Sequence, residues 1–186
     1  MPPEFDKVLD VRCYAIGYLL GSLGSLERRT AETRASGDRL WFYGSGCYTG
    51  QDGNLVANRF ITGFLFWRSG AEGEWSWTFI RPKDDPFDDF DGQLHREAKD
   101  ACIAYPSPGD LPPIPTLQWE GIREGIDDYR YAYTLERLAR KAGDQPALAA
   151  LAQLRSQVPV ARSPASPGVP QGLRAKIIEA ILELLR

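Results

Sequence analysis

Several aromatic and polar side chains stand where predicted strands of this chain end, and their types fit carbohydrate binding. Trp75 and Trp77 are two residues apart, so both face the same side of an extended strand. Flat indole faces stack on the C–H faces of sugar rings, while Tyr and Asp side chains form hydrogen bonds with sugar hydroxyls. The candidates are Asp10, Tyr14, Tyr43, Ser45, Tyr48, Trp75 and Trp77. The alternative is that one or both Trp side chains fill a core.

Cation binding by an acidic loop at residues 84–92 is the second chemistry that the sequence offers. Asp89, Asp91 and Gly92 match part of the calcium-binding loop pattern D-x-[DN]-x-[DN]-G. Because the match is incomplete, we favour a solvent-exposed loop without a metal. His95 has no partner at the spacing of a metal site or a catalytic triad, so a surface position is expected. No cofactor is indicated.

Composition and charge narrow the class of protein. The 186 residues, of which 43% are hydrophobic and five are Trp, are enough for one domain of normal size with a packed core. The formal net charge is −3 and no long basic run occurs, so nucleic acid is not expected as a partner. Cys13, Cys47 and Cys102 show no Cys-x-x-Cys spacing, which predicts buried free thiols.

Neither a signal peptide nor a membrane span is expected. The first residues lack a basic segment followed by an apolar one. The longest apolar run, residues 13–20, is interrupted by Gly17 and is too short to cross a bilayer. A membrane is therefore not expected as a partner.

The elements that would position the strand-end residues alternate between strand and helix. Short apolar runs and helical periodicity give strands at residues 7–11, 39–43, 74–80 and 101–105, and helices at residues 23–36 and 54–68. This order, with connections of this length, is typical of right-handed βαβ units. It predicts a parallel sheet.

A long amphipathic helix is predicted over residues 116–138, with Thr116 as its N-cap. One stripe at helical spacing consists of Ile122, Ile126, Tyr129 and Tyr133. Gly121 and Gly125 stand four residues apart, and each costs about 1 kcal/mol relative to Ala in a helix interior. Two such costs on one face predict a very close neighbour, which we expect to be the outside of a sheet. The alternative is an ordinary surface helix.

Residues 113–138, PIPTLQWEGIREGIDDYRYAYTLERL, resemble the closing segment of the glycoside hydrolase family 123 catalytic domain. Such domains tend to end with Tyr-Pro, a Gly-Pro-rich turn and an Arg-x-Gly-Ile-x-Asp-Tyr helix. The matching residues are Tyr105, Pro106, residues 112–115, Arg123, Gly125, Ile126, Asp128 and Tyr129. The resemblance implies a (β/α)8 barrel that acts on N-acetylhexosaminides. It also implies an Asp-Glu pair on an earlier strand, which assists attack by the acetamido group of the substrate.

The fold class that we expect is α/β, a partial (β/α)8 TIM-barrel-like segment of about three βα units followed by helices. A complete barrel needs eight strands and roughly 250 residues, whereas this chain offers three strands of that type. The predicted division is a C-terminal barrel portion at residues 1–142, a helical extension at 143–157, a Pro/Ser/Ala linker at 158–170 and a terminal amphipathic helix at 171–186. For the terminal helix, core packing is favoured over partner binding.

The carboxyl pair that the resemblance implies is missing from the predicted strand ends. The acidic pairs lie elsewhere, at Asp84-Asp85 and Asp88-Asp89 in the loop and at Asp127-Asp128 on the long helix. We therefore expect a glycoside hydrolase-like protein that is inactive by itself. The alternative is a non-catalytic carbohydrate-binding or interaction module. The expected substrate-binding residues are Asp10, Tyr43, Tyr48, Trp75 and Trp77. The expected partners are a carbohydrate and the missing N-terminal part of the barrel.

Overall fold

The computed structural model describes residues 8–21, 25–45, 55–76, 79–81, 85–87 and 101–186. Structural statements concern these residues. Several sequence-based candidates lie outside the described residues, namely Cys47, Tyr48, Trp77, Asp84, His95 and the acidic residues 88–92.

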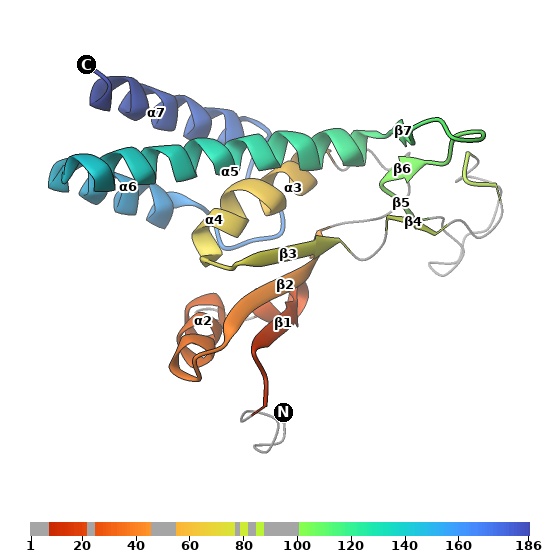
Figure 1. The fold of residues 1–186 in the computed structure, drawn as a ribbon, viewed down its shortest axis with the longest axis horizontal. Coiled ribbons are helices and arrows are strands. Elements are labelled where there is room, and N and C mark those ends of the chain that lie inside the picture. The colour runs from red at the N-terminus through yellow and green to blue at the C-terminus, as the bar shows by residue number, and fades with distance from the viewer. Residues whose placement is uncertain (1–7, 22–24, 46–54, 77–78, 82–84, 88–100) are drawn as a thin grey trace.

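The centre of the fold is a three-stranded sheet with the order β1-β2-β3 (Figure 1). The strands are β1 (Val11–Ala15), β2 (Arg39–Ser45) and β3 (Gly73–Ser76). β1 pairs with β2, and β2 with β3, both in parallel. The predicted α/β class and the predicted parallel, adjacent strands are therefore confirmed.

The first strand lies further along the chain than the sequence indicated. We expected a buried strand at residues 7–11, but β1 begins at Val11 and Val8 is 73% exposed. Apolar residues stand both before and after the start of β1, at Val8 and Leu9 and at Cys13 and Tyr14, and such short runs do not define where a strand begins. As a consequence, Asp10 precedes the first strand instead of lying near its end.

Helices connect the strands and pack on one face of the sheet. They are α1 (Ile16–Leu19) and α2 (Ser25–Ala35) before β2, and α3 (Leu55–Phe60), η3 (Ile61–Leu65) and α4 (Phe66–Ser69) before β3. Leu40 and Phe42 of β2 share a core with Leu26 of α2 and with Phe60 and Phe64 of the second connection. The helix predicted at residues 54–68 is confirmed, with a π-helical turn, η3, in its middle.

The long helix is α5 (Leu117–Ala142), and Thr116 caps it by accepting a hydrogen bond from the backbone N–H of Trp119. The predicted close contact exists, but its partner is a helix and not the sheet. A Cβ atom at Gly121 would lie 2.5 Å from the carbonyl oxygen of Leu55, and one at Gly125 would lie 2.6 Å from that of Arg59. Figure 1 shows α5 above α3 and α4, with the sheet on their other side.

Two further helices complete the helical layer, α6 (Gln145–Gln157) and α7 (Gly168–Leu184). Leu173 and Ile177 of α7 are buried in the main core, as expected for a packing helix. The stretch predicted as a linker begins with Val158, which is only 2% exposed and belongs to the same core, and α7 begins three residues before the predicted residue 171. Of the described helices, none is long and apolar enough to cross a membrane.

Four short strands lie between β3 and α5 along the chain (right in Figure 1). They form two antiparallel pairs, β4 (Ile80–Arg81) with β5 (Ala101–Cys102) and β6 (Ala104–Tyr105) with β7 (Ile114–Pro115). The strand predicted at residues 101–105 is thus two strands with different partners, and the one predicted at residues 74–80 is divided between β3 and β4. The hydroxyl of Thr116 donates to the carbonyl oxygen of Ile103, which ties the start of α5 to these strands.

Candidate functional site

The face of the sheet that lies opposite the helices carries three aromatic side chains, Trp41, Tyr43 and Trp75, here called the aromatic face. Side chains alternate along a strand, so Leu40 and Phe42 point into the core while Trp41 and Tyr43 point away from it. Tyr43 stands beside Trp75 in the register of β2 and β3. Their exposed fractions are 39% and 55%. Tyr43 and Trp75, two of the sequence-based candidates, are therefore accessible on this face, and their role in binding stays a prediction.

The aromatic face forms a shallow hollow of about 440 Å³, lined by Cys13, Trp41, Tyr43, Trp75 and Ser76. The rings of Trp41 and Trp75 have centroids 5.7 Å apart and planes inclined by 34°. Gly73 stands beside Trp41 in the register, and a Cβ atom there would lie 2.6 Å from the indole. The absence of a side chain at Gly73 thus leaves room for the Trp41 ring. Trp41 was not among the sequence-based candidates, although its position two residues before Tyr43 puts it on the same side.

Cys13, which we expected to be buried, is exposed at the edge of this hollow. Partial burial raises the pKa of its thiol above the ordinary value. Less thiolate is therefore present at neutral pH than for a free cysteine, and the thiolate is the reactive form. The environment of Cys13 is thus unlike that of an activated nucleophile.

Two other sequence-based candidates lie away from the aromatic face. Asp10 precedes β1, and its carbonyl oxygen accepts the N–H of Arg39 at 2.9 Å. Arg39 begins β2 and Tyr43 lies four residues further on, about 13 Å along the strand, so Asp10 is at the opposite end of the sheet. The hydroxyl of Tyr14 is 3.5 Å from that of Thr33, on the helical side. The predicted position of Asp10 at a strand end was wrong because β1 begins four residues later than expected, whereas Tyr14 lies near the carboxyl end of β1 with its hydroxyl on the helical side.

A second hollow lies between β3 and α5, here called the edge groove, with a volume of about 860 Å³. Its walls come from β3 and the following loop, from α5, and from side chains of the core. Lining residues include Glu72, Gly73, Trp75, Phe79, Trp119, Ile122, Ile126 and Tyr129. Phe79, Trp119 and Ile126 are 45%, 38% and 41% exposed. The predicted stripe on α5 therefore exists, but three of its members line a groove.

The buried face of α5 is a different one, made of small and polar residues: Gln118, Gly121, Gly125, Asp128, Ala132, Leu135 and Ala139. It packs on α3 and η3. A search for apolar periodicity cannot find this face because its members are not large hydrophobic residues. The two glycines were the signal in the sequence that located it.

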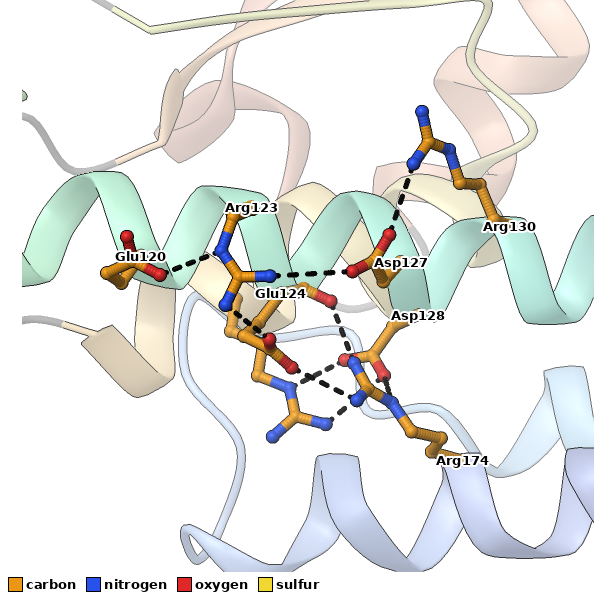
Figure 2. A network of polar contacts seen from close by, with 8 residues as sticks. Glu120, Arg123, Glu124, Asp127, Asp128, Arg130 and Arg174 are labelled. Atoms are coloured by element: carbon orange, nitrogen blue, oxygen red, sulfur yellow. Dashed lines mark hydrogen bonds and ion pairs between the residues drawn. The ribbon is translucent and has the colours of Figure 1, made fainter. Parts of the chain in front are cut away.

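The Asp127-Asp128 pair of α5 belongs to a network of ion pairs (Figure 2). Asp128 is fully buried and accepts hydrogen bonds from Arg59 of α3 at 2.7 and 3.1 Å, and another from Arg174 of α7. Arg174 also forms an ion pair with Glu124 at 3.0 Å. Burial opposes the charge of Arg174, but its hydrogen bonds to Asp128 and Glu124 outweigh this effect and raise its pKa. Asp128 is thus a structural carboxylate that joins three helices.

Asp127, in contrast, is partly exposed and lies 3.2 Å from Arg130 and 3.7 Å from Arg123. Neither Asp127 nor Asp128 lines the aromatic face or the edge groove. Among the described residues, no group of three or more His, Cys, Asp and Glu side chains is arranged to hold a metal ion. None of the described strand residues on the aromatic face is Asp or Glu.

No family model matches the chain, and no curated protein matches it.

Proposed function

We propose that this chain is a glycoside hydrolase-like protein of the family 123 type that binds N-acetylhexosamine sugars on its aromatic face without cleaving them by itself. The observation that carries the proposal is the pair Tyr43 and Trp75, which stand side by side and exposed on a sheet face that helices leave open. Aromatic rings at this spacing offer a flat surface to a sugar ring.

The order of the elements supports the same proposal. Three consecutive parallel strands with their connecting helices on one face have the arrangement of three βα units of a (β/α)8 barrel. The open face would then correspond to the inside of the barrel, and Tyr43 to a residue near the carboxyl end of a strand, where barrel enzymes bind substrate. The resemblance of residues 113–138 to the end of the family 123 domain agrees with this reading.

Catalysis by the chain alone is not part of the proposal. Glycoside hydrolysis needs carboxyl groups next to the scissile bond, and the described strand residues of the aromatic face include none. The sugar would be held by stacking and a few hydrogen bonds in an open hollow. We expect a dissociation constant of about 1 mM, equivalent to about −4 kcal/mol.

The test is a titration of the full chain with N-acetylglucosamine, followed by Trp fluorescence. Tyr43→Ala keeps all five Trp and should weaken binding about fivefold, equivalent to about 1 kcal/mol for one aromatic contact. Trp75→Ala should abolish the fluorescence response. Trp119→Ala, which removes an indole of the edge groove, is the matched control and should leave the affinity unchanged.

Two results would contradict the proposal. A response to the sugar that persists in both Tyr43→Ala and Trp75→Ala would place binding elsewhere. Turnover of a chromogenic N-acetylhexosaminide by the purified chain, lost in Asp88→Asn or Asp89→Asn, would move the chemistry to the acidic loop.

The second candidate function is that of an interaction module. It is favoured by a separate observation, the edge groove beside β3, whose position at a sheet edge fits a polypeptide better than a sugar.

A further inference from the structure

Among the strands that the structure describes, β3 lies at an edge of the sheet, and its outer side faces the edge groove. Within the part of the chain that the structure describes, β3 pairs with β2 and with no strand on its other side. The edge of a sheet presents a row of backbone N–H and C=O groups that can pair with another strand. Gly73 and Trp75 of β3 both line the groove, so an occupant would lie directly beside this backbone.

The position of α5 indicates that the space beyond β3 fits one more parallel strand. α5 follows β3 in the chain and packs on α3 and η3, the helices between β2 and β3. In right-handed βαβ units, the helix after a strand covers the gap between that strand and the next parallel one. Ile122, Ile126 and Tyr129 of α5 line the groove on the far side of β3, so they would cover such a strand.

Buried polar atoms in the groove also call for an occupant that can form hydrogen bonds. Thr62 is only 7% exposed, and its hydroxyl has no hydrogen-bond partner among the described residues. The indole N–H of Trp41 is also buried and has no hydrogen-bond partner among the described residues. Both residues line the groove. Since buried polar groups are normally paired, a polypeptide suits this groove better than a purely apolar ligand.

We propose that the edge groove binds a β-strand of a partner polypeptide, parallel to β3, with alternate apolar side chains turned toward Ile122 and Ile126. β3 has four described residues, so the pairing would extend over about 13 Å. Glu72, exposed at the amino end of β3, forms no ion pair among the described residues and lines the groove. It therefore favours a basic residue at the start of the bound strand.

A second copy of the chain fits this groove less well. Two copies that paired through β3 about a twofold axis would place the two strands antiparallel. The helix that covers the groove belongs to a parallel arrangement, since α5 continues the handed series of the connections before it. The proposal therefore commits to a different polypeptide, and self-association becomes an outcome of the test.

The test uses the full chain and a fluorescent heptapeptide, Lys-Val-Thr-Val-Thr-Val-Thr, followed by fluorescence anisotropy. We expect saturable binding that Ile126→Arg weakens at least tenfold. Ile126 is 41% exposed, so an Arg is tolerated there without unfolding. The matched control is Leu182→Arg on α7, since Leu182 is an aliphatic residue that is 51% exposed and lies outside the groove. Its affinity for the peptide should equal that of the parent chain.

Exchanging the charge at residue 72 with the charge at one end of the peptide tests whether the bound strand is parallel to β3. Glu72→Lys should weaken the Lys-first peptide several-fold, and a Glu-first peptide should recover the loss. A peptide with Glu at its last position should not recover it. Recovery by the last position alone would show antiparallel binding and overturn the proposed geometry.

Three further results would overturn the proposal. One is equal affinity for a peptide with alternate N-methylated amides, which cannot form the ladder of hydrogen bonds. Another is equal affinity in Ile126→Arg, and the third is a dimer in sedimentation experiments that binds no peptide. Tyr43 lines the aromatic face but not the groove, and Ile126 lines the groove but not the aromatic face, so Tyr43→Ala should weaken sugar binding without changing the peptide affinity, and Ile126→Arg should do the reverse. A failure of sugar binding and a failure of strand binding are therefore distinguishable.

Discussion

At the scale of single residues, Asp127 and Asp128 show how burial decides the role of a carboxylate. Asp128 is fully buried and joins Arg59 to Arg174, whereas the side chain of Asp127 is 37% exposed and contacts only surface arginines (Figure 2). Removing one partner of a buried ion pair leaves the other charges without compensation, which costs far more than the loss of a surface pair. Substitution of each of these two neighbouring residues therefore compares the loss of a buried ion pair with the loss of a surface one.

We predict that Asp128→Ala lowers the free energy of unfolding by about 3–5 kcal/mol, because Arg59 would remain charged and buried without its ion pair, while Arg174 would keep only Glu124. Asp127→Ala should lower it by less than about 1 kcal/mol. Urea denaturation followed by circular dichroism measures both values. Equal losses in the two variants would show that the contacts of Asp128 add nothing beyond those of a surface pair.

The residues of the aromatic face could be predicted only in part. Tyr43 was a candidate because its predicted strand stops there, and Trp75 because its spacing from Trp77 puts both on one side of a strand. Asp10 was misplaced because the apolar residues around Val11 extend to both sides of the true strand start. Trp41 was missed, although alternation along β2 places it beside Tyr43, because an interior strand position looks the same in the sequence whether its face is covered or open.

At the scale of elements, α5 shows that the most apolar stripe of a helix is not always its buried face. The sequence predicted the helix, its N-cap Thr116 and the close approach at Gly121 and Gly125. The partner could not be predicted, because two small residues on one face indicate that something packs closely there but do not identify the neighbour. The neighbour is the backbone of α3 and η3. The apolar stripe lies on another side of α5, where it lines the edge groove.

We predict that Gly125→Ala destabilises the protein although Ala favours helices. A methyl group at Gly125 would lie 2.6 Å from the carbonyl oxygen of Arg59 and 3.1 Å from the backbone nitrogen of Gly63, and backbone atoms cannot easily move aside. The overpacked contact should cost about 1–3 kcal/mol in the free energy of unfolding.

The control for Gly125→Ala is Gly172→Ala in the interior of α7. A Cβ atom there would meet nothing within 4 Å, so the substitution should stabilise the protein by up to about 1 kcal/mol through helix propensity alone. Midpoints of chemical denaturation measure both variants. A gain of stability in Gly125→Ala would show that α5 and α3 can separate without loss, contrary to the close-packed interface.

At the scale of the whole molecule, the pattern of β2 points to a sheet that is covered on both faces. Leu40 and Phe42 face the helices, and Trp41 and Tyr43 face the other way, so both sides of the strand are apolar. Strands of parallel sheets read in this way because helices or further strands cover both faces. In the described part of the chain, one face stays open and neither outer strand, β1 or β3, pairs with a further strand. The two proposed binding surfaces use this open face and the edge at β3.

The last prediction concerns α7, which the sequence separated from the barrel-like portion by a linker. Ile177 is fully buried in the core shared with the sheet, while Leu182 on the same helix is 51% exposed. If α7 unfolds together with the sheet, Ile177→Ala should lower the free energy of unfolding by about 2–5 kcal/mol. Leu182→Ala should change it by less than about 0.5 kcal/mol.

Trp fluorescence is the measurement that decides whether α7 and the sheet unfold together, since all five Trp precede residue 143 and none lies in α7. A shift of the Trp transition in Ile177→Ala can arise only if the loss of packing in α7 is transmitted to the sheet and its helices. Circular dichroism, which also reports α7, should give the same midpoint as fluorescence for the parent chain. A Trp transition that is unchanged in Ile177→Ala, together with a separate early loss of helical signal, would instead describe α7 as an independent unit joined through residues 158–170.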